Sequence, residues 1–197
     1  MSFLKLTDVT KFYGSTCAVQ SMNLTVQKGE FVSLLGPSGC GKTTTLQMVA
    51  GFEAVTSGRI ELDGKDITHA KANTRGLGIV FQSYALFPHM TVAANVSFGL
   101  EMRKVGTTTI MVTHDQSEAM SISDRVVVME AGRATQIDHP HRVYEHPRTR
   151  FISTFVGKAN LLPGKVTHAS GTHTHVAVGG LTVEINGARY RPGAAVL

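Results

Sequence analysis

The stretch that decides the fold is Gly36-Pro-Ser-Gly-Cys-Gly-Lys42-Thr43, which follows a continuous apolar run at residues 31–35. A short apolar run bounded by turn residues is typical of a strand buried on both faces of a parallel sheet. Residues 42–52 then carry apolar side chains at helical spacing, with a glycine near their end. The sequence therefore predicts a buried strand, a glycine-rich turn and an amphipathic helix in direct succession, which is an α/β arrangement.

The glycine-rich turn matches the pattern G-x-x-x-x-G-K-[ST] of a phosphate-binding loop, or P-loop. Glycines let successive backbone N–H groups turn inward at the positive end of a helix dipole, where they bind an anion. Lys42 is expected to reach the β- and γ-phosphates, and Thr43 to offer a hydroxyl to Mg²⁺. The residues expected to wrap the nucleotide phosphates are Gly36, Pro37, Ser38, Gly39, Cys40, Gly41, Lys42, Thr43 and Thr44. A glycine-rich turn without a ligand is the alternative interpretation.

The composition is that of a globular protein rather than a disordered one. The chain has 197 residues, of which 42% are hydrophobic and 17% are charged. Its net charge is +5, and its basic residues are scattered along the sequence without forming a run. No apolar run is long enough to span a bilayer, and no secretory leader is recognisable at its start. Cys17 and Cys40 make no disulfide framework. We therefore expect a cytosolic protein, and no nucleic-acid partner, because no basic face interleaves with aromatic residues.

The composition of the sequence and the kind of element that it predicts change near residues 155–160. Before this point, strands are predicted at residues 3–13, 22–26, 31–35, 58–62, 77–81, 108–113, 125–130 and 133–137, and helices at 42–52, 92–102, 116–122, 140–145 and 149–155. After it, short alternating segments rich in Gly, Thr, His and Val occur at residues 165–168, 173–178 and 181–185. The sequence therefore predicts a sheet-and-helix domain over residues 1–156 and a small all-β module over residues 157–197.

Three further strings, in a consistent order, resemble the ATP-binding subunits of ABC transporters. They are K-F-Y-G around Tyr13, I-V-F-Q ending at Gln82, and M-V-T-H ending at His114. The resemblance implies that Tyr13 stacks on adenine, that Gln82 in the Q-loop senses Mg²⁺ and the attacking water, and that the switch residue His114 contacts the γ-phosphate. It thus implies Lys42, Gln82 and His114 as catalytic residues, with Thr43 and Gln82 near the metal.

The same resemblance implies a cofactor pair, partners and a location. A P-loop NTPase domain would bind ATP and Mg²⁺, and the string N-L-L-P-G-K-V from Asn160 resembles the start of a TOBE domain, here truncated. The implied partners are a second ATP-binding subunit in a homodimer, transmembrane permease subunits and, indirectly, a periplasmic or extracellular substrate-binding protein. The implied location is cytoplasmic, peripheral on the inner face of the cell membrane. Importers of polyamines, iron, phosphonates and sugars are the most similar group, with the spermidine/putrescine type first.

Part of the family pattern is missing from this sequence. Family members carry an LSGGQ signature and an apolar strand ending in Asp-Glu between the Q-loop and the switch region, yet only 31 residues separate Gln82 from His114. Several helices of about 11–12 residues and a strand of about 5–6 do not fit in that interval. The pattern breaks near residues 105–106. We therefore expect the chain to lack the carboxylates that support Mg²⁺ and activate water, and not to turn over ATP. Asp115 and Glu130 also end apolar strands, but the resemblance already assigns both elsewhere.

Other interpretations remain open at this point. A non-catalytic nucleotide-binding or regulatory protein would keep the P-loop and have lost hydrolysis. A GTPase or small kinase fits less well, because the guanine-reading string Asn-Lys-x-Asp is absent. A zinc site in the β module is conceivable, since His173 and His175 share one face of a predicted strand with His168 nearby, although surface histidines are the simpler interpretation.

Overall fold

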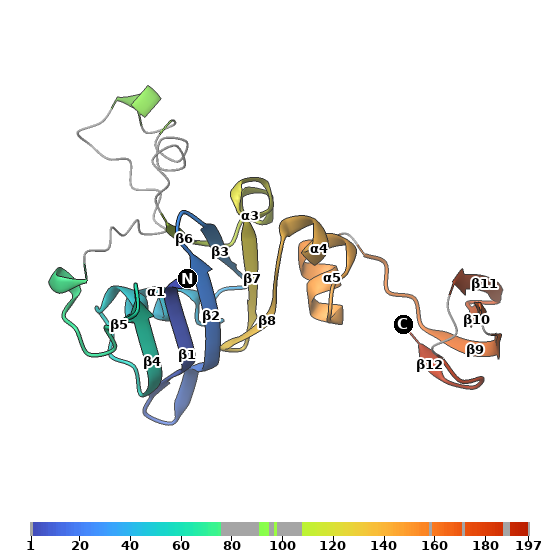
Figure 1. Ribbon diagram of the computed structural model, residues 1–197. Helices are drawn as coiled ribbons and strands as arrows, with labels where there is room; N and C mark the ends of the chain where they lie inside the picture. The colour runs from blue at the N-terminus through green and yellow to red at the C-terminus, as the bar shows by residue number, and fades with distance from the viewer. Residues whose placement is uncertain are drawn as a thin grey trace. The chain divides into compact units, whose positions relative to one another are not determined.

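The computed structural model describes residues 2–75, 91–94, 97, 108–157, 159–170, 172–186 and 190–196. The chain divides into two compact units, Met1–Gly157 and Lys158–Leu197, and Figure 1 labels the elements of each. The predicted strand at residues 77–81, most of the predicted helix at 92–102, and the expected break near 105–106 lie outside the described residues.

The first unit begins with an antiparallel sheet in the order β2-β1-β4-β5. Its strands are β1 (Ser2–Tyr13), β2 (Thr16–Gln27), β4 (Ser57–Leu62) and β5 (Lys65–Asp66). Alternating apolar residues give this sheet one buried face. The sequence predicted the second strand only at residues 22–26, but β2 begins at Thr16, because the chain pairs with β1 from the turn onward through several register shifts.

The second sheet of this unit has the order β6-β3-β7-β8, and the buried run predicted at residues 31–35 is its strand β3 (Phe31–Leu35). Strands β6 (Thr109–Thr113) and β7 (Arg125–Glu130) flank β3 and run parallel to it, while β8 (Arg133–Asp138) returns antiparallel to β7. All five residues of β3 are buried. The expectation of a strand covered on both faces is therefore confirmed.

Two hydrophobic clusters cover the opposite faces of this second sheet. Val32 and Leu34 of β3 face the larger cluster, which includes α1 (Lys42–Ala50) and the inner face of the first sheet. Leu35 faces the smaller cluster, which is formed with α3 (Gln116–Ile122), α4 (Pro140–Glu145) and α5 (Arg150–Val156). The alternation of side chains along β3 thus joins both halves of the core.

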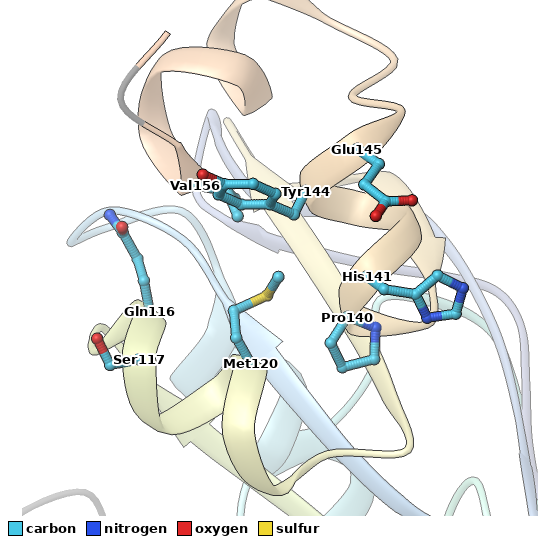
Figure 2. Close-up of a pocket in the computed structure, with 8 residues that line it drawn as sticks. All are labelled: Gln116, Ser117, Met120, Pro140, His141, Tyr144, Glu145 and Val156. Carbon is cyan, nitrogen blue, oxygen red and sulfur yellow. The ribbon is translucent and has the colours of Figure 1, made fainter.

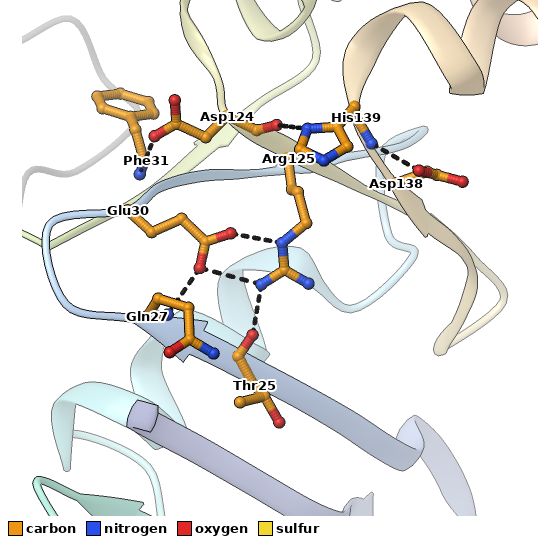
Figure 3. Close-up of polar contacts among 8 residues, drawn as sticks. All are labelled: Thr25, Gln27, Glu30, Phe31, Asp124, Arg125, Asp138 and His139. Atoms are coloured by element: carbon orange, nitrogen blue, oxygen red, sulfur yellow. Dashed lines mark hydrogen bonds and ion pairs between the residues drawn. The ribbon is translucent and has the colours of Figure 1, made fainter. Parts of the chain in front are cut away.

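A polar network closes the amino-terminal ends of β3 and β7 (Figure 3). Arg125 donates hydrogen bonds to both carboxylate oxygens of Glu30 and to the carbonyl oxygen of Thr25. The N–H of Gln27 also donates to Glu30, over 2.7 Å. Burial acts to raise the pKa of Glu30, but the bonds from Arg125 and Gln27 outweigh it and leave that pKa below its ordinary value. This end of the sheet therefore holds a charge pair with its polar atoms satisfied.

The second unit is an antiparallel sheet in the order β11-β10-β9-β12. Its strands are β9 (Gly164–Ala169), β10 (His173–Val178), β11 (Leu181–Asn186) and β12 (Ala195–Val196). Val166 and Val176 pair across β9 and β10 and are buried, whereas every residue of β11 is exposed. The predicted short strands are present, and the likeness of this unit to a TOBE domain stays a prediction.

Candidate functional site

The glycine-rich stretch forms the turn between β3 and α1, where several of its glycines cannot be replaced without strain. A Cβ added to Gly36 would lie 2.3 Å from the carbonyl oxygen of Met129 and 2.7 Å from Sγ of Cys40. Gly41 is the N-cap residue of α1 with a φ of 98°, and a Cβ there would lie 2.5 Å from the carbonyl oxygen of Ala18. The loop therefore packs its backbone directly against β2 and β7.

Lys42 is the first residue of α1, and its side chain folds back over the loop. Its ammonium donates to the carbonyl oxygens of Gly36 and Pro37 over 2.7 and 2.8 Å, and Sγ of Cys40 lies 3.5 Å away. The residue is 6% exposed, and no described carboxylate forms an ion pair with it. A buried ammonium with only neutral acceptors suits an anionic ligand, because burying an unpaired charge is costly.

The turn between β7 and β8 is hydrogen-bonded to the inner side of the glycine-rich loop. The N–H of Gly132 donates to the carbonyl oxygen of Cys40 over 3.1 Å, and the N–H of Gln20 in β2 donates to the carbonyl oxygen of Gly132 over 2.8 Å. Ser38, Gly39 and Thr43 remain exposed. The loop is thus supported on its inner side and open on its outer side, as a phosphate cradle requires. Sequence reasoning missed Gly132, because it is about ninety residues from the loop.

His114 lies at the same edge of the sheet as the P-loop. Strands β3 and β6 are parallel, and their last residues, Leu35 and Thr113, are paired. Gly36 and His114 directly follow these two residues, so both lie at the same edge of the sheet. His114 is exposed, and Asp115 after it caps α3 by accepting a hydrogen bond from the N–H of Glu118 over 3.0 Å. Predicted residues from distant parts of the sequence therefore meet at one edge. Gln82 lies outside the described residues.

Tyr13 ends β1, with its ring 46% exposed. Its hydroxyl donates to Oε2 of Glu53 over 3.0 Å, while the ammonium of Lys11 binds Oε1 of Glu53 and lies 4.8 Å from the ring centroid. Desolvation and then Glu53 raise the pKa of Tyr13, and the hydroxyl of Thr44 in the first turn of α1 acts in the opposite direction. The ring is thus held next to α1. Glu53 is forty residues from Tyr13, and no sequence signal pointed to it.

Carboxylates and histidines elsewhere do not assemble a metal site in the described part of the chain, where no three His, Cys, Asp or Glu side chains are placed to share an ion. Asp115 serves as a helix cap and Glu130 ends β7. In the second unit, Nδ1 of His173 pairs with Oε1 of Glu184 over 2.9 Å, and the rings of His168 and His175 are 5.9 Å apart. Thr43 is therefore the predicted metal-contacting residue whose position the structure gives.

A separate hollow lies among α3, α4 and α5, and Figure 2 shows the side chains around it. Its volume is about 670 Å³, with Met120, Tyr144 and Val156 as its main apolar lining and His141 and Glu145 on its polar side. None of the predicted nucleotide-binding residues lines it. The P-loop and this hollow are therefore separate features of the first unit.

The buried parallel strand, the glycine loop with its lysine, and the adjacent strand that is followed by His114 define a P-loop nucleotide-binding domain. A family model described as ABC transporter matches residues 19–149. The chain therefore belongs to the ABC transporter family, as its sequence motifs indicated. Among the described helices, none is both long and apolar enough to cross a bilayer.

Two curated relatives illustrate where in this family the chain lies. It is 37% identical to the spermidine/putrescine import ATP-binding protein PotA of Thermobifida fusca, a match that covers 90% of this chain and 67% of that protein. It is 34% identical to the Fe(3+) ions import ATP-binding protein FbpC of Brucella abortus, a match that covers 96% of this chain and 76% of that protein. The resemblance to importer ATP-binding subunits is confirmed.

The length of these matches carries further information. They extend over 259 and 268 aligned residues, whereas the whole chain has 197. Because the aligned lengths exceed the length of the chain, both relatives contain stretches that have no counterpart in it.

Solved structures show the same fold. A nucleotide-free ATP-binding cassette from an ABC transporter is 17% identical with a TM-score of 0.58, covering 71% of this chain and 92% of that one. A dimeric bacterial ABC transporter cassette is 20% identical with a TM-score of 0.57, covering 70% and 98%. The predicted fold class of the first unit, a P-loop NTPase domain of sheets and helices, is confirmed.

Proposed function

We propose that this ABC-family chain binds Mg-ATP at residues 36–44 and acts as the ATP-binding subunit of an importer. The observation that carries the proposal is the Lys42 ammonium, buried over the loop with carbonyl acceptors and no described carboxylate. The triphosphate supplies the anion that this environment lacks, and the loop amides at the start of α1 add the helix dipole. Gly36 and Gly41 let the loop backbone pack directly against β7 and β2, which supports it from its inner side.

Each predicted residue has a defined part in this proposal. Lys42 neutralises phosphate charge, and the exposed hydroxyl of Thr43 is available to Mg²⁺. Tyr13 offers a ring face to adenine next to the first turn of α1. His114 stands at the edge of the sheet where Gly36 begins the loop, in reach of the phosphate end. Gln82 is assigned to the metal and the membrane partner by sequence resemblance.

The proposed partners follow from the family. In a complete version of this subunit, two ATP-binding subunits would close together on ATP and drive permease subunits. A periplasmic or extracellular substrate-binding protein would act indirectly, on the other side of the membrane. The dimeric cassette among the similar folds supports the pairing. For the cargo we propose polyamines, supported by the 37% identity to PotA, with Fe(3+) as the competing assignment at 34% identity to FbpC. Pulldown of the genomically adjacent permease with its substrate-binding protein, followed by binding assays of that protein with polyamines and Fe(3+), would separate the two.

We further propose that the chain binds ATP without turning it over. The aligned lengths of its relatives support a missing internal segment, and no described carboxylate forms an ion pair at Lys42. The sequence between Gln82 and His114 contains no Asp-Glu pair, which in the family supplies the carboxylate that activates water, so we propose that the loop binds but does not hydrolyse. A nucleotide-binding regulatory protein that never hydrolyses is the second candidate, and it shares this expectation.

Titration calorimetry of the whole chain with Mg-ATP tests the proposal. We expect binding by the wild type, a loss of at least tenfold in affinity in Lys42→Met, about 1.4 kcal/mol, and no change in the surface control Lys65→Met. Steady-state phosphate release should stay at background. Absence of binding by folded wild-type protein would refute the binding site, and sustained release would refute the lack of turnover while leaving the binding site standing.

A further inference from the structure

Arg75 is a buried cation that forms no ion pair with a carboxylate in the described part of the chain. It is 5% exposed, and its guanidinium donates to four backbone carbonyl oxygens, those of Met48, Val49, Thr68 and Ala70, over 2.7–3.2 Å. No described acidic side chain forms an ion pair with it, and burial alone lowers the pKa of its guanidinium. A charge in such a place is costly unless its partners compensate it.

Two of those four carbonyls belong to the last turn of α1. Met48 and Val49 are followed by Ala50, the final residue of the helix, so their carbonyl oxygens lack partners within it. A cation at this end also complements the negative end of the helix dipole. Thr68 and Ala70 lie in the segment after β5, so the guanidinium ties the end of α1 to that segment.

The chain leaves room for this guanidinium. Gly51, the C-cap residue of α1, has a φ of 81°, and a Cβ on it would lie 2.5 Å from Nε of Arg75. The N–H of Gly51 donates to the carbonyl of Met48, so the glycine and the arginine share the same helix end. The two residues form one cap, built from positions 24 apart in sequence.

The helix α1 is buried along its length. Lys42, Thr45 and Leu46 are buried near the loop, and Met48, Val49 and Ala50 are almost fully buried at the end that Arg75 holds. A helix of nine residues is about 13 Å long, and its hydrogen-bonded backbone links its two ends. The position of its first turn, which carries the loop amides, therefore depends in part on how its last turn is fixed.

We propose that Arg75 is a positioning residue for nucleotide binding, which acts through α1 to hold the P-loop in its binding geometry. This inference rests on the proposed function, since the nucleotide is its readout. Among the described residues, the hydrogen bonds of Arg75 go to backbone carbonyls at the far end of the helix and in the segment after β5, so its effect on the nucleotide is indirect.

The test compares Arg75→Met, which keeps the side-chain length, with Arg75→Lys, which keeps the charge but loses the planar fork. Arg59→Met is the matched control, because Arg59 pairs with Asp66 at the surface of the same unit. Urea unfolding gives the stability of each variant, and calorimetry with Mg-ATP under fully native conditions gives the affinity. We expect the affinity to fall at least fivefold in Arg75→Met and about threefold in Arg75→Lys, and to stay within twofold in Arg59→Met.

A merely structural role predicts lower stability with Mg-ATP affinity unchanged in the folded protein, and that outcome would overturn the inference. If Arg75→Met does not fold, two other variants are compared with the Arg59→Met control for stability and Mg-ATP affinity. They are Arg75→Lys and Gly51→Ala, whose added Cβ displaces the guanidinium. If the wild type binds no Mg-ATP, the proposed function fails first. Amide exchange at Thr43–Thr45 without nucleotide then decides the positioning role, because faster exchange in Arg75→Lys supports it and unchanged exchange rejects it.

Discussion

The two ends of β3 each hold a basic side chain, in opposite electrostatic settings. At the amino end, Arg125 meets the carboxylate of Glu30 within a network that satisfies both groups. At the carboxyl end, Lys42 is more deeply buried, and its partners among the described residues are carbonyl oxygens and a thiol. The matched pair is complete without a ligand, whereas the unmatched ammonium has capacity for an anion. One strand thus separates a structural end from a binding end.

The largest effect on stability and on Mg-ATP binding should come from adding a side chain to the loop at the binding end of β3. Gly36→Ala places a Cβ 2.3 Å from the carbonyl oxygen of Met129, so strand β7 or the loop must move. We expect a loss of about 3 kcal/mol in the free energy of unfolding and no measurable Mg-ATP binding. The control is Gly39→Ala, where the added Cβ meets no atom within 4 Å and only the φ of 76° causes strain, costing about 1 kcal/mol. Equal losses in the two variants would contradict the packing argument.

The structural end should lose stability without losing nucleotide affinity when its anion is removed. Glu30→Gln keeps the shape of the side chain but leaves Arg125 without a charge partner. Because the pair is only partly buried, we expect a loss of about 2 kcal/mol in unfolding free energy, between the values for exposed and fully buried pairs. Mg-ATP affinity in the folded protein should stay within twofold of wild type. A tenfold loss of affinity would show that the two ends of β3 are not independent.

A smaller effect is expected at Tyr13, which borders the binding end. Tyr13→Ala removes the ring proposed to stack on adenine and should weaken Mg-ATP binding about tenfold, within the usual range for base–aromatic stacking. Tyr13→Phe keeps the ring and loses only the hydroxyl, which bonds Glu53, so its affinity should stay within twofold. Fluorescence titration with an ATP analogue measures both variants. Equal affinity of Tyr13→Ala and wild type would remove Tyr13 from the site.

The smallest effect is the pH dependence of the structural end. The pKa of Glu30 is lower in the folded state than its ordinary value of 4.5, so its contribution to stability is complete above that value. That contribution is lost as the pH falls through the lowered pKa of the folded state. Urea unfolding between pH 6 and 3 should therefore show a steeper acid loss in wild type than in Glu30→Gln. Parallel curves would mean that Glu30 is not stabilised by Arg125.

Local patterns were sufficient for much of the candidate site. The apolar run before Gly36 predicted β3, and the loop string predicted the place of Lys42, because both depend on neighbours within a few residues. The tertiary supports of the site gave no local signal. Gly132, Glu53 and Arg75 each act on a residue at least twenty-six positions away, so their roles depend on how the sheets pack.

The order of residues by itself determined the buried strand, the phosphate loop and the membership of the ABC transporter family. Each of these depends on short sequence motifs whose residues are close together and at fixed spacing. Only the tertiary structure decided that Arg125 pairs with a carboxylate, while Lys42 pairs with none among the described residues. The reason is physical: the electrostatic state of a side chain depends on the groups that surround it in space, and folding brings those groups from distant parts of the chain.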